Sequence, residues 1–250
     1  PRPQGVDDVI DDIITALQAA GIDAWPSSDA DPSRADTAPG LVALVDPVVQ
    51  GRLWPVQLPM DAPGTTGVYN LAGQGDIEVD GYRLGRVDTY VLTLRSPTFD
   101  PLRGMSDALI ERLAAHSGLE SWEITDAATD YEDDPRQYRA HFELQATSLA
   151  TAAPALPAVF VHGISAASGP NALASCDVRQ TVSEEIALVL VANQASLDSH
   201  RQAVATAVLG LEAARGVSPL EYVGGQRVAV SGRHVYWRET YRYDRLIRST

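Results

Sequence analysis

The distribution of apolar and polar residues predicts a strand followed by a helix at two places in the chain. The first strand is predicted at 87–94, and the helix after it begins at Asp100, with Pro101 in its first turn. The apolar residues of this helix recur at helical spacing, and they are Leu102, Met105, Leu109, Ile110 and Leu113. The second strand is predicted at 186–191, and Ser196 caps the helix that follows it. The apolar stripe of the second helix consists of Val204, Ala207, Val208 and Leu211.

The two strand–helix units match when 98 is added to each residue number, with no gap. Val91 then falls on Val189, and Leu113 on Leu211. Further along, Tyr138 falls on Tyr236. Coincidence between two amphipathic units is the alternative, because few residues are identical. We interpret the match as two copies of one small domain.

We therefore predict an α+β fold with two tandem domains, each a mostly antiparallel sheet packed by one or two helices. The first domain is placed at 1–153, with an extra N-terminal helix at 6–20 and a long loop at 51–76 that is rich in Pro and Gly. The second domain, at 154–250, is shorter and lacks the opening helix. A stretch of small residues and prolines at 147–157 is predicted to be the linker.

The remaining pattern predicts the other strands. In the first domain they lie at 41–49, 77–84 and 138–147, and the Asp80-Gly81 pair indicates a tight hairpin turn. An acidic segment at 130–134 is predicted to be a loop. In the second domain the further strands lie at 158–163, 176–181, 217–223, 227–230 and 234–246.

The charge is unusual in kind and in distribution. All 19 basic residues are Arg, and the net charge is −14. Residues 1–153 carry 25 acidic and 10 basic side chains, whereas residues 154–250 carry 8 and 9. This distribution disfavours nucleic-acid binding by the first half, and it allows an acidic face of one copy to meet an Arg-rich face of another. No apolar run is long enough for a membrane span, and the first residues resemble no signal peptide, so we expect no membrane contact and synthesis in the cytoplasm.

Candidate catalytic and metal-binding patterns are weak. The step Val161-His162-Gly163 resembles the segment before the oxyanion loop of α/β-hydrolases, but the G-x-S-x-G nucleophile elbow is absent from the sequence. No two histidines have metal-ligand spacing on a helix, and His141 and His234 are expected at the surface or a sheet edge. Cys176 is expected to be a buried, inert thiol. We therefore predict no catalytic residues, no cofactor and no metal.

The candidate subunit-interface residues are cationic, aromatic and acidic. The last strand combines Arg and aromatic side chains, a composition enriched at protein interfaces. The candidates in this strand are Tyr236, Arg238, Arg242 and Arg245. Their acidic counterparts are Asp130, Asp133 and Asp134. An ordinary outer sheet face and a single-stranded nucleic-acid surface are the alternatives.

The order of elements in the first half resembles that of tail terminator (tail completion) proteins of tailed bacteriophages. The helix at 6–20, the strands at 41–49, 77–84 and 87–94, the crossing helix from Asp100 and the strand at 138–147 carry the resemblance. The second half, from Val182 to Tyr241, resembles a second such domain. The tandem repetition departs from the one-domain pattern of the family.

The resemblance implies a structural role at the head-proximal end of the phage tail. Such proteins form a ring, usually a hexamer, that stops polymerisation of the tail tube and joins it to the head–tail connector. The implied partners are further copies of the chain, the tube protein and the connector proteins, with DNA passing through the channel without specific binding. The alternatives are another tail or neck component and, from a different class, a hydrolase that uses His162 and Ser165.

Overall fold

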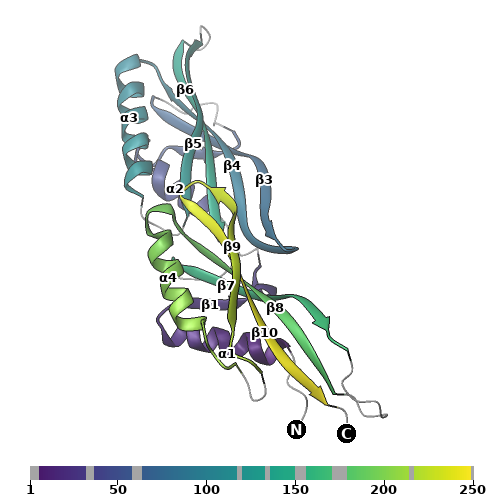
Figure 1. Cartoon of the computed structure of the whole chain (residues 1–250). Helices are drawn as coiled ribbons and strands as arrows, with labels where there is room; N and C mark the ends of the chain where they lie inside the picture. The colour runs from purple at the N-terminus through teal and green to yellow at the C-terminus, as the bar shows by residue number, and fades with distance from the viewer. Residues whose placement is uncertain are drawn as a thin grey trace.

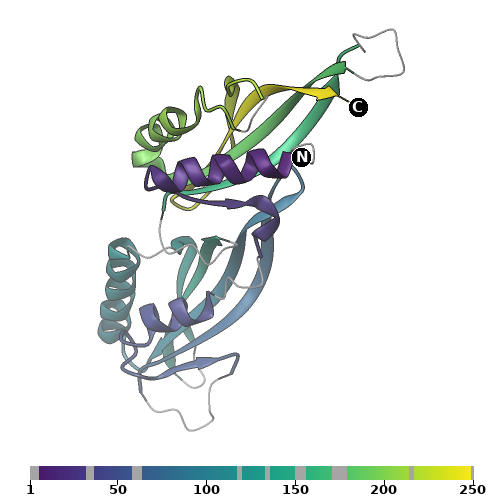
Figure 2. The same ribbon diagram turned by 90° about the horizontal axis from the view of Figure 1, so that it is seen from below.

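The chain folds into two five-stranded sheets, and one end of the first packs on a face of the second, as the computed structural model shows (Figure 1). The structure describes residues 6–31, 37–57, 64–116, 120–132, 136–149, 156–170, 179–213 and 217–248. Each sheet is covered by helices on one face, and α3 and α4 lie on the same side of the molecule (Figures 1 and 2). The predicted α+β class, with two sheet domains packed by helices, is confirmed.

The first sheet has the strand order β2-β3-β4-β6-β5. In that order the strands are Leu53–Pro55, Thr66–Val79, Tyr82–Ser96, Gln137–Leu149 and Ser121–Glu132. β2 runs parallel to β3, and the other neighbours are antiparallel. Helices α2 (Ala38–Val45) and α3 (Phe99–Ala115) bury Leu41, Leu92, Leu102 and Phe142 against this sheet.

The second sheet has the strand order β1-β7-β8-β10-β9. In that order the strands are Asp23–Pro26, Ala158–Ser168, Arg179–Asn193, His234–Arg248 and Glu221–Ser231. β1 runs parallel to β7, and the other neighbours are antiparallel. Helices α1 (Val6–Ala19) and α4 (Leu197–Val208) bury Ile13, Leu17, Leu188 and Tyr241 against it. Two 3₁₀ turns, η1 (Ser27–Asp29) and η3 (Gln194–Ser196), follow β1 and precede α4.

The two sheets therefore have the same topology, and the second copy does contain an opening helix. The prediction that α1 belongs to the first copy is wrong, because its apolar stripe packs on the second sheet. Asp23 of β1 pairs with Ala158, so the first sheet and its helices are inserted between β1 and β7. In both copies a helix and a short strand precede a long strand that runs parallel to the short one.

The constant offset of 98 residues does not hold for every strand. Gly85 pairs with Leu149, and the offset would place their counterparts at Ser183 and Ile247. Ser183 pairs with Asp244 instead. The copies therefore share topology, with a shift of register at this strand pair.

Four local predictions are corrected. The apolar run at 41–49 contains most of helix α2 instead of a strand, and Pro39 in the first turn of that helix is compatible with a helix start. The predicted loop at 51–76 contains β2 and much of β3, although residues 58–63 lie outside the described residues. Asp130 belongs to strand β5, which extends to Glu132. Helix α3 begins at Phe99 after Thr98, so Asp100 lies in its first turn and does not cap it.

Several predictions are confirmed. The Asp80-Gly81 turn joins β3 and β4, the strands at 87–94 and 186–191 lie inside β4 and β8, and Ser196 precedes α4. The linker prediction falls partly outside the described residues, since β6 continues to Leu149 and residues 150–155 are not described.

An apolar seam joins the two sheets, and it is separate from the two helix-covered cores. We define the interdomain seam by its buried residues, which are Ile77, Val79, Leu84, Leu149, Ala158, Phe160, Val189, Val191 and Tyr236. The first four come from the first sheet and the others from the second sheet. The seam lies on the face of the second sheet opposite its helices, because Val189 and Val191 alternate with the helix-facing Leu188 and Leu190.

Candidate functional site

The β3–β4 hairpin of the first sheet reaches the second sheet with its tip. Asp80 and Gly81 at this tip have φ values of +51° and +85°, which a two-residue turn with left-handed residues requires. Asp80 Oδ2 lies 2.9 Å from His162 Nε2 on β7 and 2.7 Å from Arg238 Nε on β10. The turn therefore places one carboxylate in a hydrogen bond with His162 and in an ion pair with Arg238, both on the other sheet.

His162 is buried, and both of its ring nitrogens have partners. Ser27 Oγ lies 2.8 Å from Nδ1, and the His162 side chain is only 3% exposed. The Tyr82 ring lies 4.6 Å from the imidazole, between centroids. The Asp80 carboxylate can only accept a hydrogen bond, so the hydrogen of the neutral imidazole lies on Nε2, which donates to Asp80. Nδ1 then accepts a hydrogen bond from the Ser27 hydroxyl.

Burial lowers the pKa of His162, although the Asp80 carboxylate acts in the opposite direction and Arg238 lowers the pKa further. The imidazole is therefore neutral at pH 7. The four residues Ser27, His162, Asp80 and Arg238 form a polar latch between the two sheets, next to the interdomain seam.

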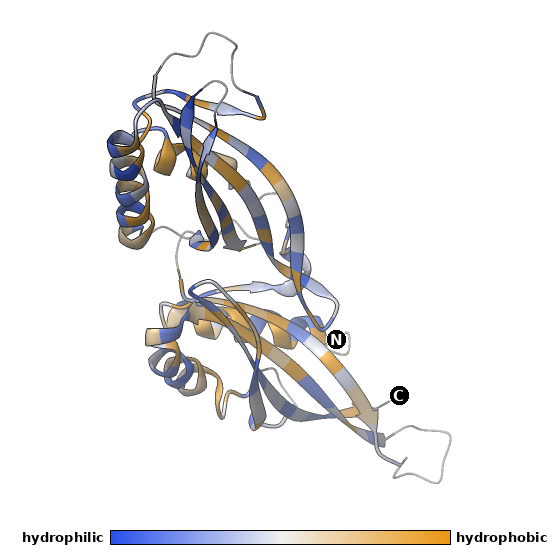
Figure 3. Cartoon of the chain, turned by 90° about the horizontal axis from the view of Figure 1, so that it is seen from above, coloured by the Kyte–Doolittle hydropathy of each residue, from blue (hydrophilic) through white to orange (hydrophobic). Residues whose placement is uncertain are grey.

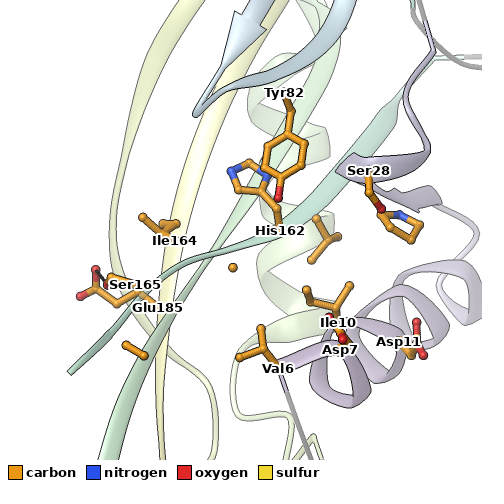
Figure 4. Close-up of a pocket in the computed structure, with 14 residues that line it drawn as sticks. Val6, Asp7, Ile10, Asp11, Ser28, Tyr82, His162, Ile164, Ser165 and Glu185 are labelled. Carbon is orange, nitrogen blue, oxygen red and sulfur yellow. Dashed lines mark hydrogen bonds between the residues drawn. The ribbon is translucent and has the colours of Figure 1, made fainter. Parts of the chain in front are cut away.

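A groove of about 620 Å³ opens beside the latch (Figure 4). One wall is the N-terminal half of α1, with Val6 and Ile10 and the carboxylates of Asp7 and Asp11. The other wall is strand β7 from Val161 to Ala166, with Glu185 of β8 behind it. We call this space the β7 groove.

Ser27, His162 and Asp80 include the residue types of a hydrolytic triad, but their geometry favours a structural role. Ser27 is 2% exposed and is absent from the lining of the β7 groove, so a substrate in the groove would not reach its hydroxyl. Ser165, the serine considered in the hydrolase hypothesis, lies 3.4 Å from Glu185 and forms no described contact with His162. In the described ranges, no three metal-ligating side chains gather at one place.

The predicted interface residues of the last strand lie in three different environments. Arg238 forms part of the latch, and Tyr236 is fully buried in the interdomain seam, so neither side chain belongs to a free surface. Burial raises the pKa of the Tyr236 hydroxyl. Arg242 is half-exposed and lies 2.6 Å from Glu185, which lowers the pKa of that carboxyl. Arg245 lies 2.6 Å from the buried Glu184.

The predicted acidic interface residues are described only in part. Asp130 lies 2.9 Å from Arg139 of the neighbouring strand, and hydrogen bonding to Arg139 lowers the pKa of its carboxyl. Asp133, Asp134 and Cys176 lie outside the described residues. His141 is partly exposed as expected, whereas His234 is 2% exposed, so its expected surface position is wrong.

Neither Ser27 nor the role of Asp80 in joining the sheets was predicted from the sequence. The Asp80-Gly81 pair did indicate the turn that carries Asp80. No local pattern could indicate its partners, because His162 and Arg238 are 82 and 158 positions further along the chain.

No protein family model matches the chain, and no curated protein matches it. Among the described residues, no helix has the length and hydrophobicity needed to cross a membrane.

We expect the folded chain to lose stability in weakly acidic solution, because His162 is buried in the latch. Because the pKa of His162 is lower in the folded chain, the unfolded chain binds a proton first as the pH falls below about 6.5. The free energy of unfolding should therefore decrease as the pH falls below about 6.5, by about 1.4 kcal/mol for each pH unit by which folding lowers the pKa of His162. Urea unfolding between about pH 6.5 and 5 measures the decrease.

The control is His162→Asn, whose amide does not titrate. The variant should be less stable at pH 7.5 but should lack this part of the pH dependence. Equal slopes for both proteins between pH 6.5 and 5 would contradict the assignment.

Proposed function

We propose that the chain is a structural protein of a phage tail, which assembles into a ring at the head-proximal end of the tail tube and stops its polymerisation. The observation that supports the proposal is the repeated sheet unit. Two copies of one topology are joined by a buried seam and a polar latch, where an enzyme would commonly have an open cleft between domains.

The edges of both sheets support a role in assembly. β5 and β9 are edge strands of 12 and 11 residues, and most of their residues are exposed. β9 exposes Tyr222, Val223 and Val230, and β5 exposes Tyr131. Long edge strands with apolar side chains are suited to pairing with another chain.

The net charge suits a ring through which DNA moves. The chain has a net charge of −14, and an acidic lining would let DNA slide without specific binding. In this proposal we place the first sheet and its helices along the channel, since residues 37–149 carry 17 acidic and 8 basic side chains.

The oligomeric state of the purified protein is the first test. We expect a closed ring, most simply a hexamer, at micromolar concentration by light scattering and native mass spectrometry. With purified tail tubes, negative-stain microscopy should show one ring at one end of each tube. Decoration along the tube or at the distal end would assign the chain to another tail component. A monomer that never binds tubes would overturn the proposal.

A further inference from the structure

Strand β7 has a free edge along the β7 groove. In the described part of the chain, β1 pairs with β7 only from Ala158 to Val161, whereas β7 continues to Ser168. The backbone from 162 to 168 therefore has a strand neighbour, β8, on one side only. A sheet edge of this kind can accept an added strand through main-chain hydrogen bonds.

The two sides of this free edge differ in chemistry. On the helix side, Val6 and Ile10 of α1 lie near β7, and a Cβ atom on Gly163 would be 3.0 Å from Val6 Cγ1 (Figure 4). Asp7 and Asp11 of α1 are exposed on the same side, and no ion pair is described for either carboxylate. An added strand would need apolar and cationic side chains facing the helices.

Strand β9, at the opposite edge of the same sheet, has that pattern. Arg227 is opposite Trp237 and therefore lies on the same face, and Arg201 of α4 packs over the Trp237 ring, so this is the helix-covered face. Tyr222 and Val230, opposite Tyr241 and Val235, share that face and are 46% and 51% exposed. Arg227 is exposed, and no ion pair is described for it.

We propose that β9 of one copy adds to the free edge of β7 in the next copy. A sheet that continues from copy to copy keeps its helices on one side, so Arg227 would meet Asp7 and Asp11, and Val230 or Tyr222 would meet Val6 and Ile10. Within one sheet β7 runs opposite to β8, β8 to β10 and β10 to β9, so the new pair is antiparallel.

This contact joins two different surfaces, so a pair of copies keeps one free β9 on one copy and one free β7 edge on the other. Such a heterologous contact closes into a ring when the rotation between copies permits it. The inference rests on the self-association proposed above and names the surfaces that produce it.

Charge reversal tests the contact without knowledge of the strand register. Arg227→Glu should weaken self-association about tenfold, because Glu then meets Asp7 and Asp11. The double variant Asp7→Arg and Asp11→Arg should weaken it similarly, because Arg227 then meets arginines. An equimolar mixture of the two proteins should recover wild-type association, since every contact in an alternating ring pairs opposite charges. Sedimentation velocity measures all three samples.

Matched controls are Arg103→Glu and Asp107→Arg on α3, both of which change exposed charges. These controls should associate as the wild type does. Rings that form equally well in every variant would overturn the β9–β7 contact and leave the proposed function standing. A wild-type chain that stays monomeric would overturn both. Complementation by the mixture without any binding to tail tubes would support the contact and count against the tail function.

Discussion

Replacement of Arg245 by leucine should lower the free energy of unfolding by about 3–5 kcal/mol, because it leaves a buried carboxylate without its cation. Arg245 Nη2 and Nε lie 2.6 and 2.8 Å from Oε1 of Glu184, and the Glu184 side chain is 2% exposed. The Tyr243 hydroxyl donates to the other oxygen of Glu184 but carries no charge. Urea unfolding at pH 7.5 measures the loss.

Arg242→Leu is the matched control, because it removes the neighbouring arginine of the same strand. Arg242 pairs with Glu185 at 2.6 Å, but the two side chains are 49% and 26% exposed. Water can solvate Glu185 after the change, so we expect a loss of about 0–1 kcal/mol. The double variant Glu184→Leu with Arg245→Leu removes both buried charges and should recover most of the stability lost in Arg245→Leu. Equal losses for the two single variants would contradict the distinction between the two pairs.

These arginines show what a strand pattern can predict. Alternation places Tyr236, Arg238 and Arg242 on one face of the last strand, and the structure confirms that they share a face. Arg245 was predicted to lie with them, but it lies on the other face, where it pairs with Glu184. The pattern could not show that the hairpin tip at Asp80 covers part of this face, since that contact joins residues far apart in the sequence. Tyr236 therefore looked like a surface aromatic residue in the sequence although it is buried.

The N-terminal helix shows the same limit at the level of the fold. The stripe formed by Val9, Ile13 and Leu17 correctly predicts an amphipathic helix. A stripe shows which side of a helix is buried, but it does not show which sheet covers that side. The answer depends on the pairing of Asp23 with Ala158, which are 135 positions apart. The helix was therefore assigned to the sheet that follows it directly in the sequence, whereas it packs on the second sheet.

The apolar run at 41–49 shows a local ambiguity. A short apolar run is compatible with both a buried strand and a buried helix, and its length does not distinguish between them. Leu41, Leu44 and Val45 are buried in α2, with the spacing of a helix. By contrast, the alternating run at 138–147 was correctly predicted as a strand and lies in β6, because only a strand gives a period of two.

The second large effect is expected at the interdomain seam. Phe160 is fully buried there, with residues of the first sheet such as Leu84 and of the second such as Tyr236, and its ring centroid lies 6.2 Å from that of Trp25. Phe160→Ala should lower the free energy of unfolding by about 3–5 kcal/mol, because it removes buried apolar surface and leaves a cavity that both sheets line. Because the seam joins the two sheets, the variant should also separate their unfolding into two transitions.

Differential scanning calorimetry measures both effects, and Phe99→Ala is the control. Phe99 is 46% exposed and packs against the Tyr138 ring at 5.6 Å, so its loss should cost about 1 kcal/mol or less. The seam is the buried apolar contact between the two sheets. If Phe160→Ala resembles Phe99→Ala and still unfolds in one transition, the seam does not couple the sheets, and their fixed arrangement must come from the latch at Asp80 and His162.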